Sequence, residues 1–259
     1  MNQYHFLVYG EDERQCCLKE ILENRGHVVK NAEEYSAGFF DAILLPLPET
    51  EKYFCQIAEK LIAGEVVFGT NFGQNMVRQA ADRKVCLVDY MKEEGVAEKN
   101  AVSVAEGILA EAISIMKVNL CGSRCLVCGF GRCGSVVTDR LTACKASVDV
   151  FEKDRNKMQA VAEAGAHWKD HAKPAEYALI VNTVPKPLFT DTILRECGRE
   201  VCILDLASGS GGVDLLYCKE HGICAKRCPG LPARYAPKAA AEILADVIEK
   251  KMEIRARGV

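Results

Sequence analysis

Residues 120–135 read LCGSRCLVCGFGRCGS, and this stretch decides the fold because two incompatible sites can be built from it. One site uses Cys121, Cys125 and Cys128, whose C-x3-C-x2-C spacing suits an iron–sulfur cluster, with Cys133 as a fourth thiolate. The run RCLVC, however, is apolar and strand-like, and residues three apart on a strand point to opposite faces. Cys125 and Cys128 therefore do not converge, and we predict no metal site.

The other site uses the glycines of the same stretch. Gly129, Gly131 and Gly134 form a G-x-G-x-x-G loop that follows an apolar strand and opens a helix. The first glycine permits a tight turn, the second lets the backbone approach a pyrophosphate, and the third lets the helix pack on the strand. Glu152 ends the next strand about twenty residues on, as dinucleotide-binding folds require. We therefore predict a dinucleotide-binding loop.

The residues after the second strand leave the choice of nucleotide open. A carboxylate at Glu152 accepts hydrogen bonds from ribose hydroxyls, which favours NAD and repels a 2′-phosphate. Lys153 and Arg155 follow directly and could reach a 2′-phosphate. We expect NAD or NADP as the cofactor.

The composition is that of an ordinary globular protein. The 259 residues are 49% hydrophobic and 27% charged, with a formal net charge of -3, so no basic field is expected to attract nucleic acid. No apolar run approaches the ~20 residues of a membrane span and no secretory segment is recognisable, so we expect a cytoplasmic protein without a membrane partner. Most of the 14 cysteines lie in apolar runs, and we expect them to be reduced and mainly buried.

Short β-branched runs alternate with amphipathic helical stretches, which predicts an α/β fold with βα units and parallel sheets. We predict two domains: a smaller flavodoxin- or Rossmann-like domain over residues 1–100 and a Rossmann NAD(P)-binding domain over 119–236. Residues 101–118 are expected to form a connecting helix, and a helix over 237–259 to pack back on the first domain. The expected strands are 4–10, 41–48, 65–70, 85–90, 123–128, 147–152, 177–185, 201–208 and 223–232.

In an open α/β sheet the ligand lies beyond the carboxyl ends of the strands, and here those ends carry polar, proline and glycine residues. Asp205 stands directly at an apolar strand end, which favours a hydrogen-bonded site residue over a solvated one. The predicted cofactor residues are Gly129, Gly131, Arg132, Cys133, Gly134, Glu152, Lys153, Asn182, Thr183, Pro185 and Ala207. The catalytic candidates are Asp205, Ser208 and Lys238. The five histidines are scattered, and we interpret each as structural.

The predicted substrate-binding residues are Arg14, Arg234 and Tyr235. Arg14 follows the first strand-to-helix turn, and it faces a cleft if the domains are arranged as in most two-domain dehydrogenases. Arg234 and Tyr235 follow the PGLP turn near the last strand.

The sequence resembles the A chains of the dipicolinate synthase family along nearly its whole length. The blocks that carry the resemblance are GEDERQ (10–15), NAVSVAEG (100–107), GFGRCG (129–134), VNTVP (181–185), LDLASGSGGVD (204–214) and CPGLPARYAPKAAAEIL (228–244). The last three blocks, in this order and spacing, are far more specific than the glycine loop alone.

The resemblance implies an oxidoreductase of bacterial sporulation, which oxidises a dihydrodipicolinate-type intermediate of the lysine pathway to dipicolinate with NAD(P). It also implies a small dicarboxylate substrate and, as partner, the flavoprotein-like B chain of dipicolinate synthase, while a homo-oligomer stays open. Two features depart from the family: the loop after LPLP is shorter, and Gly209 stands where an arginine usually follows LAS. Either Arg234 compensates for that arginine or the activity has changed.

Two other functions stay open. A dehydrogenase of 2-hydroxy or amino acids would need a histidine or lysine as acid and base, for which Lys238 is the obvious candidate. A nucleotide-binding module without turnover would be compatible with Gly209.

Overall fold

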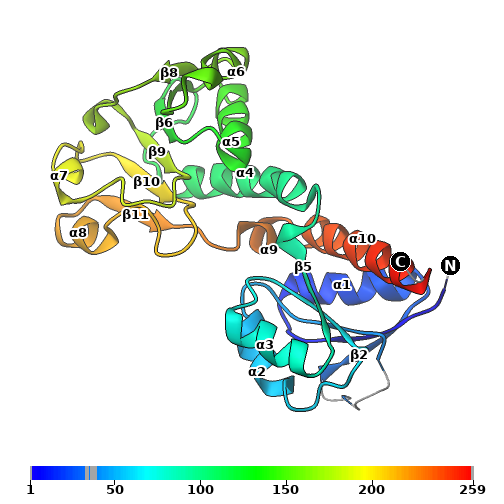
Figure 1. The fold of residues 1–259 in the computed structure, drawn as a ribbon. Coiled ribbons are helices and arrows are strands. Elements are labelled where there is room, and N and C mark those ends of the chain that lie inside the picture. The colour runs from blue at the N-terminus through cyan, green and yellow to red at the C-terminus, as the bar shows by residue number, and fades with distance from the viewer. Residues whose placement is uncertain (1, 33–34, 36–39, 258–259) are drawn as a thin grey trace. The chain divides into compact units, whose positions relative to one another are not determined.

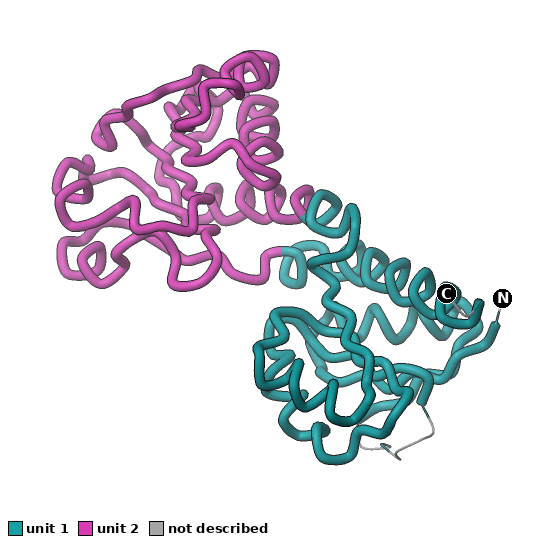
Figure 2. Tube along the Cα trace, viewed as in Figure 1, with its two compact units in different colours: residues 1–100, 232–259 teal, residues 101–231 magenta. Residues whose placement is uncertain are grey.

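The structure, a computed structural model, divides into two compact units (Figure 2). Unit 1 comprises residues 1–100 and 232–259, and unit 2 comprises residues 101–231. Within the described part of the chain, no helix is both long and apolar enough to cross a membrane. The residues that the structure describes are 2–32, 35 and 40–257.

Unit 1 is built on a five-stranded parallel sheet in the order β2-β1-β3-β4-β5 (Figure 1). This is the order of flavodoxin-like sheets, in which the winding direction reverses between β1 and β3. Its strands are β1 (His5–Val8), β2 (Val28–Asn31), β3 (Ala42–Leu44), β4 (Val66–Gly69) and β5 (Cys86–Asp89). Its helices are α1 (Glu13–Asn24), α2 (Thr50–Ile57), α3 (Gln74–Asp82), the 3-10 helix η2 (Tyr90–Lys92) and α10 (Pro237–Ala256).

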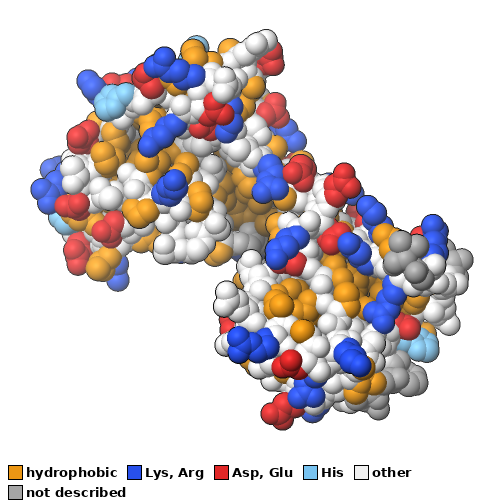
Figure 3. Space-filling view, in the orientation of Figure 1, with side chains coloured by type: hydrophobic (Ala, Val, Ile, Leu, Met, Phe, Trp, Pro, Cys, Tyr) orange, Lys and Arg blue, Asp and Glu red, His pale blue; other side chains and the backbone are white. Residues whose placement is uncertain are grey.

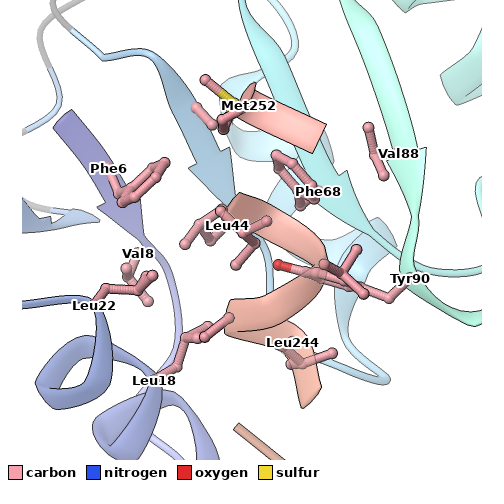
Figure 4. Packing of buried hydrophobic residues seen from close by; sticks show 14 of the residues in the cluster. Phe6, Val8, Leu18, Leu22, Leu44, Phe68, Val88, Tyr90, Leu244 and Met252 are labelled. Carbon is pink, nitrogen blue, oxygen red and sulfur yellow. The ribbon is translucent and has the colours of Figure 1, made fainter. Parts of the chain in front are cut away.

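The central strands β1, β3 and β4 of unit 1 are buried on both faces of the sheet, which is why they are almost entirely apolar. Phe6 and Val8 belong to one apolar cluster and Leu7 to another, because successive side chains of a strand alternate between faces. Helices α1 and α10 pack against each other over the first cluster and bring Leu18 and Leu244 to it (Figure 4). The C-terminal helix is thus part of the core of unit 1.

Unit 2 contains a six-stranded parallel sheet in the order β11-β10-β9-β6-β7-β8. This is the Rossmann order, with its switch point between β6 and β9. The strands are β6 (Arg124–Cys128), β7 (Ser147–Phe151), β8 (His167–Lys169), β9 (Leu179–Asn182), β10 (Cys202–Asp205) and β11 (Cys224–Arg227). The helices are α5 (Arg132–Ala143), η3 (Arg155–Lys157), α6 (Met158–Glu163), η4 (Pro174–Glu176), α7 (Asp191–Leu194) and α8 (Leu215–Glu220).

Two helices contain the points at which the chain changes units: α4 (Val96–Ile115) and α9 (Leu231–Tyr235). Helix α4 begins earlier than the expected residue 101. Its buried residues Ala105, Ile108 and Ala112 join the core cluster of unit 2, so most of the helix belongs to that unit.

Acidic and basic side chains are interspersed on the face of the protein seen in Figure 3.

Two strands were not expected from the sequence. β2 and β8 are edge strands of four and three residues, and none of their side chains is fully buried. A short edge strand needs no continuous apolar run, so hydrophobic patterning does not reveal it.

The expectation that most cysteines are buried is wrong. Five of the 14 are buried, four are half-buried, and the exposed ones are Cys16, Cys55, Cys86, Cys121 and Cys224. All 14 are free thiols. The exposed cysteines lie on helix surfaces, in a loop and at strand starts, where an apolar neighbourhood in sequence does not guarantee burial.

Candidate functional site

The glycine loop connects β6 to α5 and brings them into very close contact. At Gly129 the backbone φ is +91°, in the left-handed region that favours glycine, and a Cβ there would lie 2.6 Å from Thr183 Oγ1. At Gly134, in the first turn of α5, a Cβ would lie 2.1 Å from the carbonyl oxygen of Gly129. Helix and strand end therefore approach more closely than any side chain would allow.

Gly131, the middle glycine of the motif, faces open space. It is the N-cap of α5, its backbone is extended, and no heavy atom lies within 4 Å of the position that a Cβ would take. Because a glycine offers no capping side chain, the first amides of α5 can donate to an anion. Tight packing on one side and an open approach on the other fit a bound pyrophosphate.

Thr183 supports the glycine loop from the neighbouring strand. Its backbone amide and its hydroxyl donate to the carbonyl of Cys128, at 3.0 and 2.8 Å. Pro185 follows in the same connection and is exposed. The first two residues of α5 are Arg132, which is exposed, and Cys133, which is half-buried. Burial raises the pKa of the Cys133 thiol, and the charge of Arg132 acts in the opposite direction.

Glu152 follows β7 and binds the glycine loop. Its Oε2 accepts from the amide of Phe130 at 3.0 Å and from Lys157 Nζ at 2.9 Å. Its Oε1 accepts from the amides of Lys153 and Asp154 at 2.8 and 3.1 Å. Burial raises the pKa of this carboxyl, but these donors, the Asp154 amide foremost and then Lys157, outweigh burial and lower the pKa to about 2. The group is therefore an anion at neutral pH.

These four donors also bear on nucleotide choice. A carboxylate offers about four acceptor positions, so a ribose hydroxyl must share Glu152 with its internal donors or displace one of them. Lys157 is the donor with a flexible side chain, and its charge offsets that of Glu152. The side chain of Lys153 is exposed. The site thus joins a carboxylate to nearby cations and does not exclude a 2′-phosphate.

Asn182 and Asp205 form a buried pair at the ends of β9 and β10. Their relative exposures are 0% and 1%, and Asn182 Nδ2 donates to Asp205 Oδ1 at 2.9 Å. Asn182 Oδ1 accepts from the amide of Val184 at 3.1 Å, while Asp205 accepts from the amides of Ala207 and Gly212 at 3.1 and 2.9 Å. These contacts fix the loops that follow both strands, so the pair positions neighbouring groups rather than projecting toward a ligand.

The loop after β10 carries Ala207 and Ser208. Ala207 is buried, and its amide donates to Asp205, whereas Ser208 is exposed. Arg227, the last residue of β11, is not among the candidates predicted from the sequence. Its Nη2 donates to the carbonyls of Ala207, at 3.1 Å, and Gly209. Its position at the carboxyl end of a strand is the one signal in the sequence that points to it.

Arg14 lies in the first turn of α1 in unit 1 and is only 6% exposed. Its Nη2 donates to the carbonyl of Leu47, and the carboxylate of Asp12 is 4.0 Å away. Its Nε has no hydrogen-bond partner among the described residues, and the same holds for the buried hydroxyl of Tyr90. Burial lowers the pKa of Arg14, and Asp12 and Tyr90 act against that shift. Asp12 itself caps α1 by accepting from the amide of Gln15.

The remaining predicted residues also belong to unit 1. Arg234 and Tyr235 end α9, and the guanidinium carbon of Arg234 is 5.3 Å from the centroid of the Tyr235 ring. Lys238 lies in the first turn of α10 and is exposed. The structure thus brings the predicted cofactor residues together in unit 2, with Asp205 and Ser208, and places the substrate candidates and Lys238 in unit 1.

The cysteines of the opening stretch do not converge. Cys125 packs in one core cluster of unit 2 and Cys128 in the cluster on the other face of the sheet. Burial raises the pKa of Cys125 to about 12 and also raises that of Cys128, which disfavours the thiolate that a metal needs. Over the described ranges, no three His, Cys, Asp or Glu side chains gather as metal ligands.

An apolar pocket of about 130 Å³ opens beside Cys128, the residue that precedes the glycine loop. Cys128 and Phe151, the last residues of β6 and β7, form part of its wall. The other lining residues are Leu126, His171, Ala172, Pro174, Leu188, Phe189 and Ile193. The pocket thus borders the strand end that precedes Glu152.

Comparison with known proteins gives a consistent picture. No family model matches the chain. The A chain of dipicolinate synthase from Bacillus subtilis (strain 168) is 33% identical over 184 residues, which are 68% of this chain and 61% of that protein, so the match spans less than two thirds of the relative.

Solved structures extend the similarity to the whole chain. The A chain of dipicolinate synthase from Bacillus halodurans has a TM-score of 0.86 and 26% identity, with 96% of this chain and 97% of that chain covered. The solved structure of the A chain from Bacillus subtilis has a TM-score of 0.82 and 26% identity, with 99% and 98% covered. D-lactate dehydrogenase from Escherichia coli, at 12% identity, a TM-score of 0.65 and 97% coverage of both chains, shares the fold alone.

Proposed function

This protein belongs to the family of dipicolinate synthase A chains, and we propose on that basis that it oxidises a dihydrodipicolinate-type intermediate of the lysine pathway to dipicolinate. The proposal includes NAD or NADP as oxidant, a cytoplasmic role in sporulation, and the B chain of dipicolinate synthase as partner. The observation that carries it is the cradle made by Gly129, Gly131 and Gly134, tight against the strand and open at the N-terminus of α5.

The residues around this cradle fit a dinucleotide. Gly129, Gly131 and the amides that begin α5 would hold the pyrophosphate. Glu152 would accept from the ribose, with Lys153 beside it. The apolar pocket next to Phe151 is suited to the adenine. Thr183, Pro185 and Ala207, which follow β9 and β10, would border the nicotinamide half, and the buried Asn182 at the end of β9 would hold this part of the site in place.

The proposed substrate is a cyclic dicarboxylate that becomes aromatic on oxidation. When bound, the nicotinamide accepts the hydride that the ring loses. The protein must neutralise two carboxylates and accept a proton. Arg14 is suited to the first task because its buried Nε has no partner among the described residues, and Arg234 with Tyr235 is our second candidate.

The candidates for the group that accepts the proton are Ser208, Lys238 and Asp205. Ser208 and Lys238 are exposed and free to approach a ligand. Asp205 is held by three donors, so we assign it the role of fixing the loop that carries Ala207 and Ser208.

The test is turnover with an enzymatically generated lysine-pathway intermediate and NAD or NADP, with and without the B chain. The absorbances of the reduced nicotinamide and of the pyridine dicarboxylate should rise together, and the Gly131→Asp variant should show neither. Reduction of the nicotinamide only with 2-hydroxy or amino acids would indicate the alternative dehydrogenase. Nucleotide binding without any turnover would indicate a non-catalytic module.

A further inference from the structure

Arg227 ends β11, on one side of the Rossmann switch point in unit 2. Such a sheet consists of two mononucleotide-binding halves. Glu152, at the end of β7, marks the half formed by β6 to β8 as the adenosine side. The half formed by β9 to β11 is then the side of the nicotinamide, where a reacting ring must lie. Arg227 is therefore a cation at the carboxyl edge of the reactive half.

The side chain of Arg227 is held in place by the loop after β10. Its Nη2 donates to the carbonyls of Ala207 and Gly209. The loop is shaped around it: Gly211 has a φ of +87°, and a Cβ there would lie 2.4 Å from Asp205 Oδ2 and 3.4 Å from Arg227 Cζ. A side chain at this position is thus excluded by conformation and by contact. One nitrogen of the guanidinium is fixed, and the plane of the group is set with it.

In the described part of the chain, Arg227 forms no direct ion pair, although the Asp205 carboxylate lies nearby. Asp205 flanks the same glycine, but its oxygens accept from Asn182 Nδ2 and from the amides of Ala207 and Gly212. Nη1 and Nε of Arg227 form no hydrogen bond with the residues described. Arg227 is half-buried and its printed hydrogen bonds go to neutral carbonyls, while the nearby Asp205 carboxylate is occupied by other donors, so the remaining N–H groups of Arg227 stay available to an anion.

We propose that Arg227 binds one carboxylate of the dicarboxylate substrate through the edge of its guanidinium that the loop leaves open. The inference rests on the proposed function and adds a carboxylate subsite that lies wholly within unit 2. The fixed plane of the guanidinium suits the two oxygens of a carboxylate, and the neighbouring Ser208 is exposed.

The test compares two ligands that differ by one carboxylate. Dipicolinate and picolinate are titrated by calorimetry into the full chain with saturating oxidised nucleotide. Arg227→Gln removes the charge and leaves a shorter polar side chain. Dipicolinate should bind about tenfold to a hundredfold more weakly. Picolinate should weaken by about twofold at most, because its single carboxylate can use the remaining subsite.

Two controls separate binding from loop structure. Arg195→Gln removes another cation of unit 2, one that pairs with Asp191 on α7, and should change neither affinity. Nucleotide affinity should also be unchanged in Arg227→Gln. Equal weakening of dipicolinate and picolinate would show that Arg227 only shapes the loop, and would overturn the proposal.

A measurement on the unaltered protein covers the case in which Arg227→Gln does not fold. Phenylglyoxal modifies accessible arginines, and peptide mass spectrometry measures the rate at each one. Dipicolinate should slow the modification of Arg227 at least about fivefold and leave Arg195 unaffected. If Arg227 were modified at the same rate with and without dipicolinate, its assignment to the carboxylate subsite would be overturned, while the proposed function would stand. Absence of dipicolinate binding to the unaltered chain would instead overturn the proposed function, and this subsite with it.

Discussion

Replacing Gly131 by aspartate should separate nucleotide binding from folding. The backbone at this N-cap is extended (φ -92°, ψ -162°), and nothing lies within 4 Å of the Cβ position, so a side chain fits without strain. Aspartate is a better N-cap than glycine by a few tenths of a kcal/mol and meets the positive end of the helix dipole. We therefore expect a melting temperature equal to that of the unaltered protein or about 1 to 3 °C higher.

The same carboxylate should abolish nucleotide binding. It occupies the open side of the cradle, and its charge repels a pyrophosphate. Losing one charge-assisted hydrogen bond costs about 1.5 to 3 kcal/mol. Repulsion between unit charges at about 4 Å adds about 1 to 4 kcal/mol, depending on solvent exposure. The affinity for NAD and NADP should thus fall at least about a hundredfold.

The assay is calorimetric titration with both nucleotides, together with thermal unfolding of the free protein. Gly131→Asn is the matched control, because asparagine caps the helix without a charge; it should bind nucleotide more weakly than the unaltered protein but better than Gly131→Asp. Unchanged nucleotide affinity in Gly131→Asp would refute the assignment of the loop. A large loss of stability would refute the claim that this position is open.

Four further outcomes are expected. Gly134→Ala should lower stability by about 1 to 3 kcal/mol in urea unfolding, since its Cβ meets the Gly129 carbonyl at 2.1 Å; unchanged stability would contradict this close packing. The pKa of Glu152, about 2, lies below the usual ~4.3, so its ionised form stabilises the fold above about pH 4.5 and this effect is lost as the pH falls toward 2. The difference in free energy of unfolding between the unaltered protein and Glu152→Gln should accordingly be larger at pH 7 than at pH 3.5. An equal difference at both pH values would contradict the lowered pKa of Glu152. Arg234→Ala should weaken dipicolinate about tenfold to a hundredfold in calorimetry and leave nucleotide affinity unchanged, whereas the reverse pattern would assign Arg234 to the cofactor. Protein purified anaerobically should contain no stoichiometric iron or zinc, and about one equivalent of either would restore the cluster interpretation.

The sequence by itself determined the fold class and the position of the glycine loop between β6 and α5. Parallel strands buried on both faces must be apolar throughout, so the central strands of both sheets are visible as β-branched runs. The three glycines could be assigned separate roles because each role follows from the absence of a side chain: left-handed φ at Gly129, open approach at Gly131 and close packing at Gly134. Such constraints are local, and a local pattern reveals them.

Tertiary structure alone decided how the polar residues at the strand ends are used. Asn182 and Asp205 are 23 positions apart, yet they hydrogen-bond each other because β9 and β10 are neighbours in register. The loop around Arg227 depends in the same way on β10 pairing with β11. The edge strands β2 and β8 could not be predicted from the sequence, because hydrogen bonding to the neighbouring strand, rather than burial of apolar side chains, defines them. Strand order and register are set by packing of the whole chain, and they determine which charges are neutralised within the protein and which stay available to a ligand.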